Sequence, residues 1–422
     1  MRYFRIFIFI GAIAVYLVLP GYTQEVLTWD DCISESLKTH PDLISAQETI
    51  RQARSDRDIV RSRMLTQFAS QMSARTSKSN GETQDSYSYG VTGEQLLFDG
   101  NKISSDIKVA DQTVTAQTYG YAVTSSNVRL ALRDAFIALL RAQELVPLTE
   151  AIAKRRKENL DLVQLRYDAG REHKGALYTA QADLAQAEFE VDQARRDVSL
   201  AQSQLIKELG RTQRTIDMSV TGDFTVSEGN GPTPDFTYLA DNTPLLQQLI
   251  AKKDAARFNV QSAQADFFPQ VYVNTSAARS SSKWPPEDDQ WGVGVSVSFP
   301  LFEGGSRIAQ VAKRQSALTQ ARADERSGRD TVLVTLEETW TDLADSIGTV
   351  GVKEKFLAAA QERAKIASAQ YSTGLISFDD WIIIENNLVN AKKDFLNARA
   401  NMLVSEARWI QAKGGTLEYD RN

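Results

Sequence analysis

The stretch 290–302 alternates between apolar and small polar residues, and this alternation predicts a β-strand. From Trp291 to Phe299 every odd position is apolar, and from Gly292 every even position is Gly or Ser. A period of two gives a strand one apolar face and one polar face. The apolar face consists of Trp291, Val293, Val295, Val297 and Phe299. A polar loop joins this strand to another that is predicted over 270–278.

Segments rich in Ala, Glu, Lys, Arg and Gln surround this hairpin and predict helices. In the second half of the chain, the helices are predicted over 243–266, 306–370 and 378–413. In the first half, they are predicted over 30–64, 101–166 and 176–210, with strands over 67–76 and 86–98. At about 1.5 Å per residue, the two longest helices make rods of roughly 100 Å.

The two halves are copies of one unit, because residues match at a nearly constant spacing. Pro41 matches Pro244 at a shift of 203 residues, and Tyr167 matches Tyr371 at a shift of 204. The first copy is predicted over 24–210 and the second over 243–422. The Gly- and Pro-containing stretch 211–242 is predicted to be an irregular connection near the middle of the helices. Pro147 is expected to break or kink the first long helix.

The N-terminal residues 1–23 fit a secretory signal peptide, with Arg2 and Arg5 before an apolar run over 6–19. A retained N-terminal anchor is the alternative. No later stretch is long and apolar enough to cross a membrane as a helix. A single cysteine, Cys32, cannot form an internal disulfide, and we expect it to be a small apolar residue on a helix face.

Charge and composition exclude several classes of function. The formal net charge of −6 argues against a nucleic-acid partner, and the basic run 154–157 is diluted by neighbouring acidic residues. The two histidines, His40 and His173, have no partners at metal-ligand spacing. We expect no enzyme activity, no cofactor and no metal. His40 is interpreted as a helix-start residue.

Four strands at the end of long rods need a closed structure if they enter a membrane, because every backbone polar group must be paired there. Four strands are too few to close a barrel, so several copies of the chain would have to contribute. The predicted fold class is therefore mainly α with a membrane β-barrel portion. A soluble helical assembly with two decorative hairpins is the alternative.

Four sets of residues resemble motifs of the TolC-like outer-membrane efflux proteins. They are the opening helix from Leu27, the strand entry at Phe268, the strand exit at Leu301, and the helix-tip turns after Tyr167 and Tyr371. The resemblance implies a homotrimer in which a 12-stranded barrel continues into a hollow α-helical cylinder. It implies an outer-membrane location extending into the periplasm, with contact to outer-membrane lipid. It also implies a periplasmic adaptor and an inner-membrane transporter as partners, in a tripartite efflux or secretion system.

The resemblance further implies a gate at the periplasmic mouth, made of tip contacts and a ring of aspartates. Asp380, nine residues after Tyr371, matches one acidic position of that ring. The second acidic position is Ile383 here, and an arginine common in the family is Ile376. The corresponding acidic position of the first copy is Ala176. Asp380, Tyr371 and Ile383 are therefore the candidate gate residues.

Each of these candidates also has a plain structural interpretation. Asp380 follows Ser377 by three residues, which is the spacing of a helix capping box. Tyr167 and Tyr371 are either hinge contacts or packing residues at a turn. His173 is either a charge sensor for an adaptor or an ordinary exposed turn residue.

The candidate adaptor contacts at the helix tips are Tyr167, Gly170, His173 and Gly374. The candidate lipid-facing residues are Trp291, Val293, Val295 and Val297. Two other functions remain open for this sequence, a passive outer-membrane pore and a secreted coiled-coil scaffold.

Overall fold

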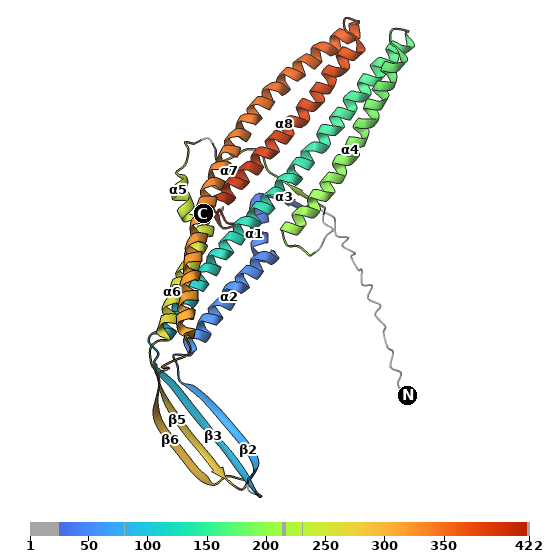
Figure 1. The fold of residues 1–422 in the computed structure, drawn as a ribbon. Coiled ribbons are helices and arrows are strands. Elements are labelled where there is room, and N and C mark those ends of the chain that lie inside the picture. The colour runs from blue at the N-terminus through green and yellow to red at the C-terminus, as the bar shows by residue number, and fades with distance from the viewer. Residues whose placement is uncertain (1–24, 80, 213–216, 230, 420–422) are drawn as a thin grey trace, which may run out of the picture.

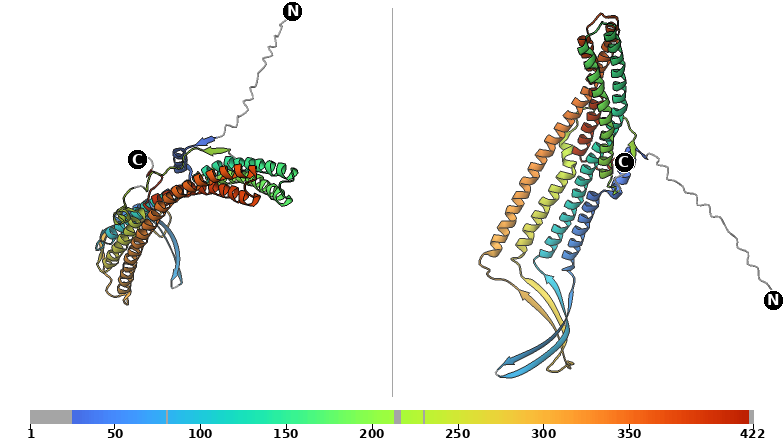
Figure 2. Two further views of the ribbon diagram at one scale, coloured as in Figure 1. Left: turned by 90° about the horizontal axis from the view of Figure 1, so that it is seen from above. Right: turned by 90° about the vertical axis from the view of Figure 1, so that its right-hand side faces the viewer.

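The computed structural model describes residues 25–79, 81–212, 217–229 and 231–419. The predicted signal peptide over 1–23 lies outside these residues. A four-stranded sheet lies at one end of the molecule (Figure 1). At the other end lie two turns, one between α3 (Lys102–Asp168) and α4 (Lys174–Glu208) and one between α7 (Ser306–Thr373) and α8 (Phe378–Ala412). Seen from above, the helices form a curved wall (Figure 2).

The first copy contains β1 (Glu25–Leu27), α1 (Trp29–Thr39), α2 (Pro41–Ser62), β2 (Gln67–Ser79), β3 (Glu82–Phe98), α3 (Lys102–Asp168) and α4 (Lys174–Glu208). The connection contains β4 (Met218–Val220) and α5 (Phe236–Asn242). The second copy contains α6 (Pro244–Ala265), β5 (Gln270–Ser281), β6 (Asp288–Ser298), α7 (Ser306–Thr373) and α8 (Phe378–Ala412).

One prediction about the helices is wrong. The single helix expected over 30–64 is two helices, because His40 is extended and Pro41 starts a new helix as its first residue. By contrast, α3 runs through Pro147 without a break, in agreement with the continuous helix predicted over 101–166. A proline costs one backbone hydrogen bond, and the neighbouring helices hold the 67-residue α3 together.

Two predictions about extended segments also need correction. The stretch 211–242 was expected to be irregular, yet β4 pairs in parallel with β1 and α5 packs on α7. The strand expected over 290–302 ends at Ser298. Pro300 lacks the N–H group that a continuing ladder needs at that point.

The register of the sheet places the apolar residues of both copies on one face. Directly paired residues point to the same side. Val273 pairs with Val295, Ala277 pairs with Trp291, and Ala277 also pairs with Val91 of β3. The candidate residues of this face are strongly exposed, at 82% for Trp291, 71% for Val293, 67% for Val295 and 65% for Val297.

The elements lie side by side in a constant lateral order. The sheet order is β2–β3–β5–β6, and next to it the helices are ordered α2–α3–α6–α7. Nearer the tips, the order is α4–α3–α8–α7. The wall therefore has one edge made by β2, α2 and α4, and another made by β6 and α7.

A hydrophobic core at mid-height joins α1 and the β1–β4 pair to α3, α4 and α8. Cys32 is fully buried in it, and burial raises the pKa of its thiol to about 12. Among the described residues, the helices contain no span apolar and long enough to cross a bilayer.

Candidate functional site

The two helix-tip turns have the same backbone structure. In the first, Arg171 N–H donates to the Arg166 carbonyl and Gly170 has a φ of 69°. In the second, Leu375 N–H donates to the Gln370 carbonyl and Gly374 has a φ of 81°. These bonds define a Schellman motif, in which glycine supplies the left-handed residue. The repeated Tyr-x-x-Gly spacing predicts this turn from sequence.

A hydrophobic cluster, which we call the tip cluster, holds the two tips together. Its buried members come from α3, α4, α7 and α8, and they are Val163, Ala176, Leu177, Ala180, Ala367, Tyr371, Phe378 and Trp381. Both copies contribute to it. The tip of α7–α8 is therefore packed directly on the tip of α3–α4 within one chain.

Tyr371 lies at the centre of the tip cluster and is 0% exposed. Its hydroxyl donates a hydrogen bond of 2.8 Å to Glu172 Oε2, in the turn of the first copy. Burial is the main cause that raises the pKa of Tyr371, and the bond to the Glu172 carboxylate adds to it. The phenol therefore stays neutral and keeps its proton to donate.

Two further side chains enclose the Tyr371 ring. Trp381 stacks on one face at 4.2 Å between ring centroids, with 10° between the planes. The guanidinium carbon of Arg166 lies 4.5 Å from the ring centroid. Arg166 Nη1 also donates a 2.7 Å hydrogen bond to the Tyr371 carbonyl oxygen.

The other candidate gate residues lie on the first turns of α8. Asp380 is exposed, its backbone N–H donates to Ser377 Oγ at 3.1 Å, and its carboxylate accepts from the Ser377 hydroxyl at 2.7 Å. Asp380 thus takes part in a helix cap and still presents its carboxylate to solvent. Ile383 is 57% exposed, whereas Ile376 packs on the tip cluster.

The candidate adaptor contacts differ in exposure. Gly170, His173 and Gly374 are exposed, and Tyr167 is half-buried against the tip cluster. His173 is the N-cap of α4, and its Nδ1 accepts from Ala176 N–H at 3.1 Å.

Below the tips, a seam of charged side chains ties α3 and α4 to α8. Arg155 donates two hydrogen bonds to Glu385, from Nε at 2.6 Å and from Nη2 at 2.7 Å. Asn159 adds a third at 3.4 Å. Lys393 bonds to Glu190 of α4 at 2.6 Å. Glu385 is 1% exposed, and the hydrogen bonds from Arg155 and Asn159 compensate for its removal from water.

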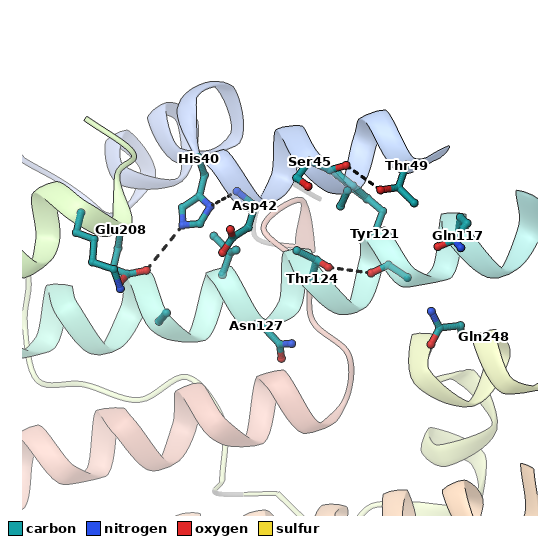
Figure 3. Close-up of a pocket in the computed structure, with 15 residues that line it drawn as sticks. His40, Asp42, Ser45, Thr49, Gln117, Tyr121, Thr124, Asn127, Glu208 and Gln248 are labelled. Carbon is teal, nitrogen blue, oxygen red and sulfur yellow. Dashed lines mark hydrogen bonds and ion pairs between the residues drawn. The ribbon is translucent and has the colours of Figure 1, made fainter. Parts of the chain in front are cut away.

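A polar hollow of about 680 Å³ lies at mid-height, where the end of α4 meets the start of α2 (Figure 3). His40 caps α2 there, with Nδ1 accepting from Asp42 N–H at 3.2 Å. Its Nε2 lies 3.8 Å from Glu208 of α4. His40 therefore has the helix-start position that the sequence predicts, and it also connects α2 to α4. The described residues contain no group of His, Cys, Asp and Glu that would hold a metal ion.

Sequence reasoning did not identify Glu172, Arg166 or Trp381. The acidic position that the resemblance implies in the first copy is Ala176, which is buried in the tip cluster. The structure supplies a carboxylate from Glu172 instead, four residues earlier. In the sequence, the only signal for Glu172 is that it is an acidic residue in the first tip turn. The packing of this turn on the second tip turn is visible only in the structure.

Comparisons with known proteins match most of the chain to outer-membrane efflux proteins and channels. Residues 32–211 and 238–415 match the family described as outer membrane efflux protein. The outer membrane protein TolC of Escherichia coli (strain K12) is 23% identical over 366 residues, covering 81% of this chain and 72% of that protein. The outer membrane efflux protein BepC of Brucella suis is 20% identical over 328 residues, covering 77% and 71%. The crystal structure of the Campylobacter jejuni CmeC outer membrane channel superimposes with a TM-score of 0.83 at 17% identity, covering 92% of this chain and 86% of that one.

Proposed function

The chain belongs to the outer membrane efflux protein family, and on that basis we propose that three copies form one duct through the outer membrane and the periplasm. The protein is an outer-membrane component of an efflux or secretion system and extends into the periplasm. Its family consists of channel proteins rather than enzymes.

The observation that carries the proposal is the pair of unlike edges on the wall. The sheet leaves β2 and β6 at its borders, and α2, α4 and α7 continue these borders along the helices. Because the two edges differ, copies would meet through unlike edges, and such a head-to-tail contact forms a ring when the rotation between copies closes. Closure removes the open strand edges, as a membrane demands. Three copies of the four-stranded sheet supply 12 strands, and the number three comes from the resemblance.

The apolar face of the sheet is then the lipid-facing surface. The lipid-facing residues are Trp291, Val293, Val295 and Val297. The opposite face, with Ser296 and Asn274, lines the lumen. The exposure of these apolar side chains in a single chain supports this assignment, because contact of such a face with water costs free energy that contact with lipid does not.

The helix tips form the periplasmic gate in this proposal. The bond from Tyr371 to Glu172 is a latch that keeps the two tips of one chain together. Asp380 and Ile383 of three chains narrow the mouth, so the constriction is partly electrostatic and partly apolar.

Membrane fractionation followed by chemical crosslinking tests the duct. We expect the protein to need detergent for extraction and to yield a crosslinked species of three chains. A soluble monomer would contradict the proposal and favour the secreted scaffold. A detergent-extracted trimer that binds no periplasmic adaptor would favour the passive pore.

The adaptor is tested separately, by pull-down with an adaptor and its inner-membrane transporter. The tip turns with Tyr167, Gly170, His173 and Gly374 are the proposed contact surface. His173→Asn keeps a capping side chain on α4 and removes the imidazole. Reduced adaptor capture by this variant, with unchanged trimer assembly, supports contact through His173. Unchanged capture leaves His173 a capping residue only.

A further inference from the structure

The contacts around Tyr371 exist in only one of the two copies. At the spacing that relates the copies, Arg166 matches Gln370 and Trp381 matches Leu177. The first copy therefore lacks a matching pair of planar side chains around Tyr167. Tyr371 of the second copy is therefore contacted by Arg166 and Trp381, which have no equivalent side chains at the matching positions of the other copy.

Arg166 connects the first tip to the end of α7 in two ways. Its Nη1 donates to the Tyr371 carbonyl at 2.7 Å, in the last turn of α7. Carbonyl groups at a helix C-terminus carry partial negative charge, so a cation there is favourable. Its guanidinium also lies over the Tyr371 ring at 4.5 Å, a cation–π contact. The side chain is only 18% exposed, which limits screening by water.

Trp381 encloses the ring from the opposite side. Its ring is nearly parallel to that of Tyr371 and is fully buried. The indole N–H is buried without a hydrogen-bond partner among the described residues. The indole therefore contributes through its stacked face and not through its N–H group.

This enclosure fixes the direction of the Tyr371 hydroxyl. Two planar groups packed on the ring restrain the side chain from swinging about χ1, the torsion that places the phenol oxygen, and that oxygen lies 2.8 Å from Glu172. Arg166 Nε lies 3.8 Å from the same Glu172 oxygen, so the arginine also attracts the acceptor.

We propose that Arg166 is a positioning residue of the closed tip, which acts through Tyr371. It orients the latch and joins the first copy's tip to the C-terminus of α7. The inference rests on the proposed gate. Opening then requires Arg166 to leave the α7 carbonyl, so that the α7–α8 tip separates from the α3–α4 tip.

The test is the conductance of closed trimers in planar lipid bilayers. Arg166→Gln removes the positive charge, the guanidinium hydrogen bond to the Tyr371 carbonyl and the cation–π contact with the Tyr371 ring. We expect it to raise the closed-state conductance roughly tenfold. Arg171→Gln is the matched control, since Arg171 is an exposed arginine of the same turn. It loses the same charge and should leave conductance unchanged. Trp381→Leu removes the aromatic face that stacks on Tyr371 and should also conduct more than wild type.

Non-additivity distinguishes positioning from general support of the fold. If Arg166 acts mainly through the Tyr371 side chain, Arg166→Gln should raise conductance less in a Tyr371→Leu background than in wild type, because only the bond to the residue-371 carbonyl is then left to lose. The double variant should keep the trimer thermal stability of Tyr371→Leu. Arg166→Lys, compared with Arg171→Lys, repeats the test with the charge retained if Arg166→Gln fails to assemble. Arg166→Lys should conduct more than wild type and more than Arg171→Lys, because lysine reaches the carbonyl without a planar stack on Tyr371.

Equal conductance of the Arg166 and Arg171 variants would overturn the inference. If Tyr371→Phe still raised conductance in that case, the latch would stand without Arg166. If Tyr371→Phe also had no effect, the gate proposal would fail with it.

Discussion

Replacing Arg155 by methionine should destabilise the seam between the two copies, and the structure indicates by how much. The change removes two hydrogen bonds from the Glu385 carboxylate, which is 1% exposed. Asn159 remains as a donor at 3.4 Å. Breaking a buried pair by removing one partner costs about 3–5 kcal/mol.

Two features of the seam reduce that estimate. Arg155 is 34% exposed, so water can enter the space it leaves. Lys392 lies nearby, and its pKa is lowered by burial and then by repulsion from Arg155. Without Arg155 that repulsion disappears, and Lys392 becomes a better partner for Glu385. We therefore expect a loss of about 2–3 kcal/mol for Arg155→Met.

The assay is thermal unfolding of the detergent-purified protein, followed by far-ultraviolet circular dichroism. Lys353→Met is the matched control, because its pair with Asp394 is exposed at 38% and 50%. Such a pair contributes about 0–1 kcal/mol. The double variant Arg155→Met, Glu385→Leu removes both charges and should recover most of the lost stability. A melting temperature of Arg155→Met equal to that of Lys353→Met, or a double variant less stable than the single one, would refute this account of the seam.

Four other outcomes are expected. Val295→Arg should cost about 2–4 kcal/mol if it faces lipid near the midplane, whereas Ser296→Arg should assemble normally; greater damage from the serine change, measured by trimer yield, would reverse the two faces. Asp380→Ala should lower cation selectivity and weaken block by multivalent cations in planar bilayers, while the lost cap costs only about 1 kcal/mol; unchanged selectivity would leave Asp380 a capping residue. Burial and a carboxylate acceptor raise the pKa of Tyr371 in the folded protein. The stabilisation of the closed tip by the Tyr371 hydroxyl is therefore complete below the ordinary tyrosine pKa of about 10 and is lost as pH rises through the higher folded pKa. Closed-state conductance should rise at strongly alkaline pH, and Tyr371→Phe should lack this rise. Asn101 has a φ of 68°, so Asn101→Val should lower the melting temperature and Asn101→Gly should not, with circular dichroism as the measurement.

Local patterns account for most of what the sequence predicted about the fold. The alternation around Val295 indicates a strand with two unlike faces, because side chains alternate along any extended chain. Gly170 and Gly374 indicate the tip turns, because a left-handed residue after a helix favours glycine. Pro147 does not interrupt α3, since the cost of a proline inside a helix is local while the packing of α3 extends over its whole length.

The site at the tips depends on contacts that no local pattern encodes. Tyr371 is visible in the sequence as a repeated position, but its partner Glu172 precedes it by 199 residues. Arg166 is visible only as a residue next to Tyr167, and its role follows from the packing of one copy's turn on the other's.

The sequence alone therefore determined the duplicated order of elements, the apolar face of the strands and the resemblance to outer-membrane efflux proteins. Each of these is a property of neighbouring residues or of a fixed spacing. Only the tertiary structure shows that Glu172 is the carboxylate that accepts from Tyr371 and that Arg166 is the cation at the C-terminus of α7. It also shows that Arg155 and Asn159 compensate for the burial of Glu385. These contacts arise where the α3–α4 and α7–α8 pairs meet, because side chains distant in sequence must satisfy one another's charges and hydrogen bonds there.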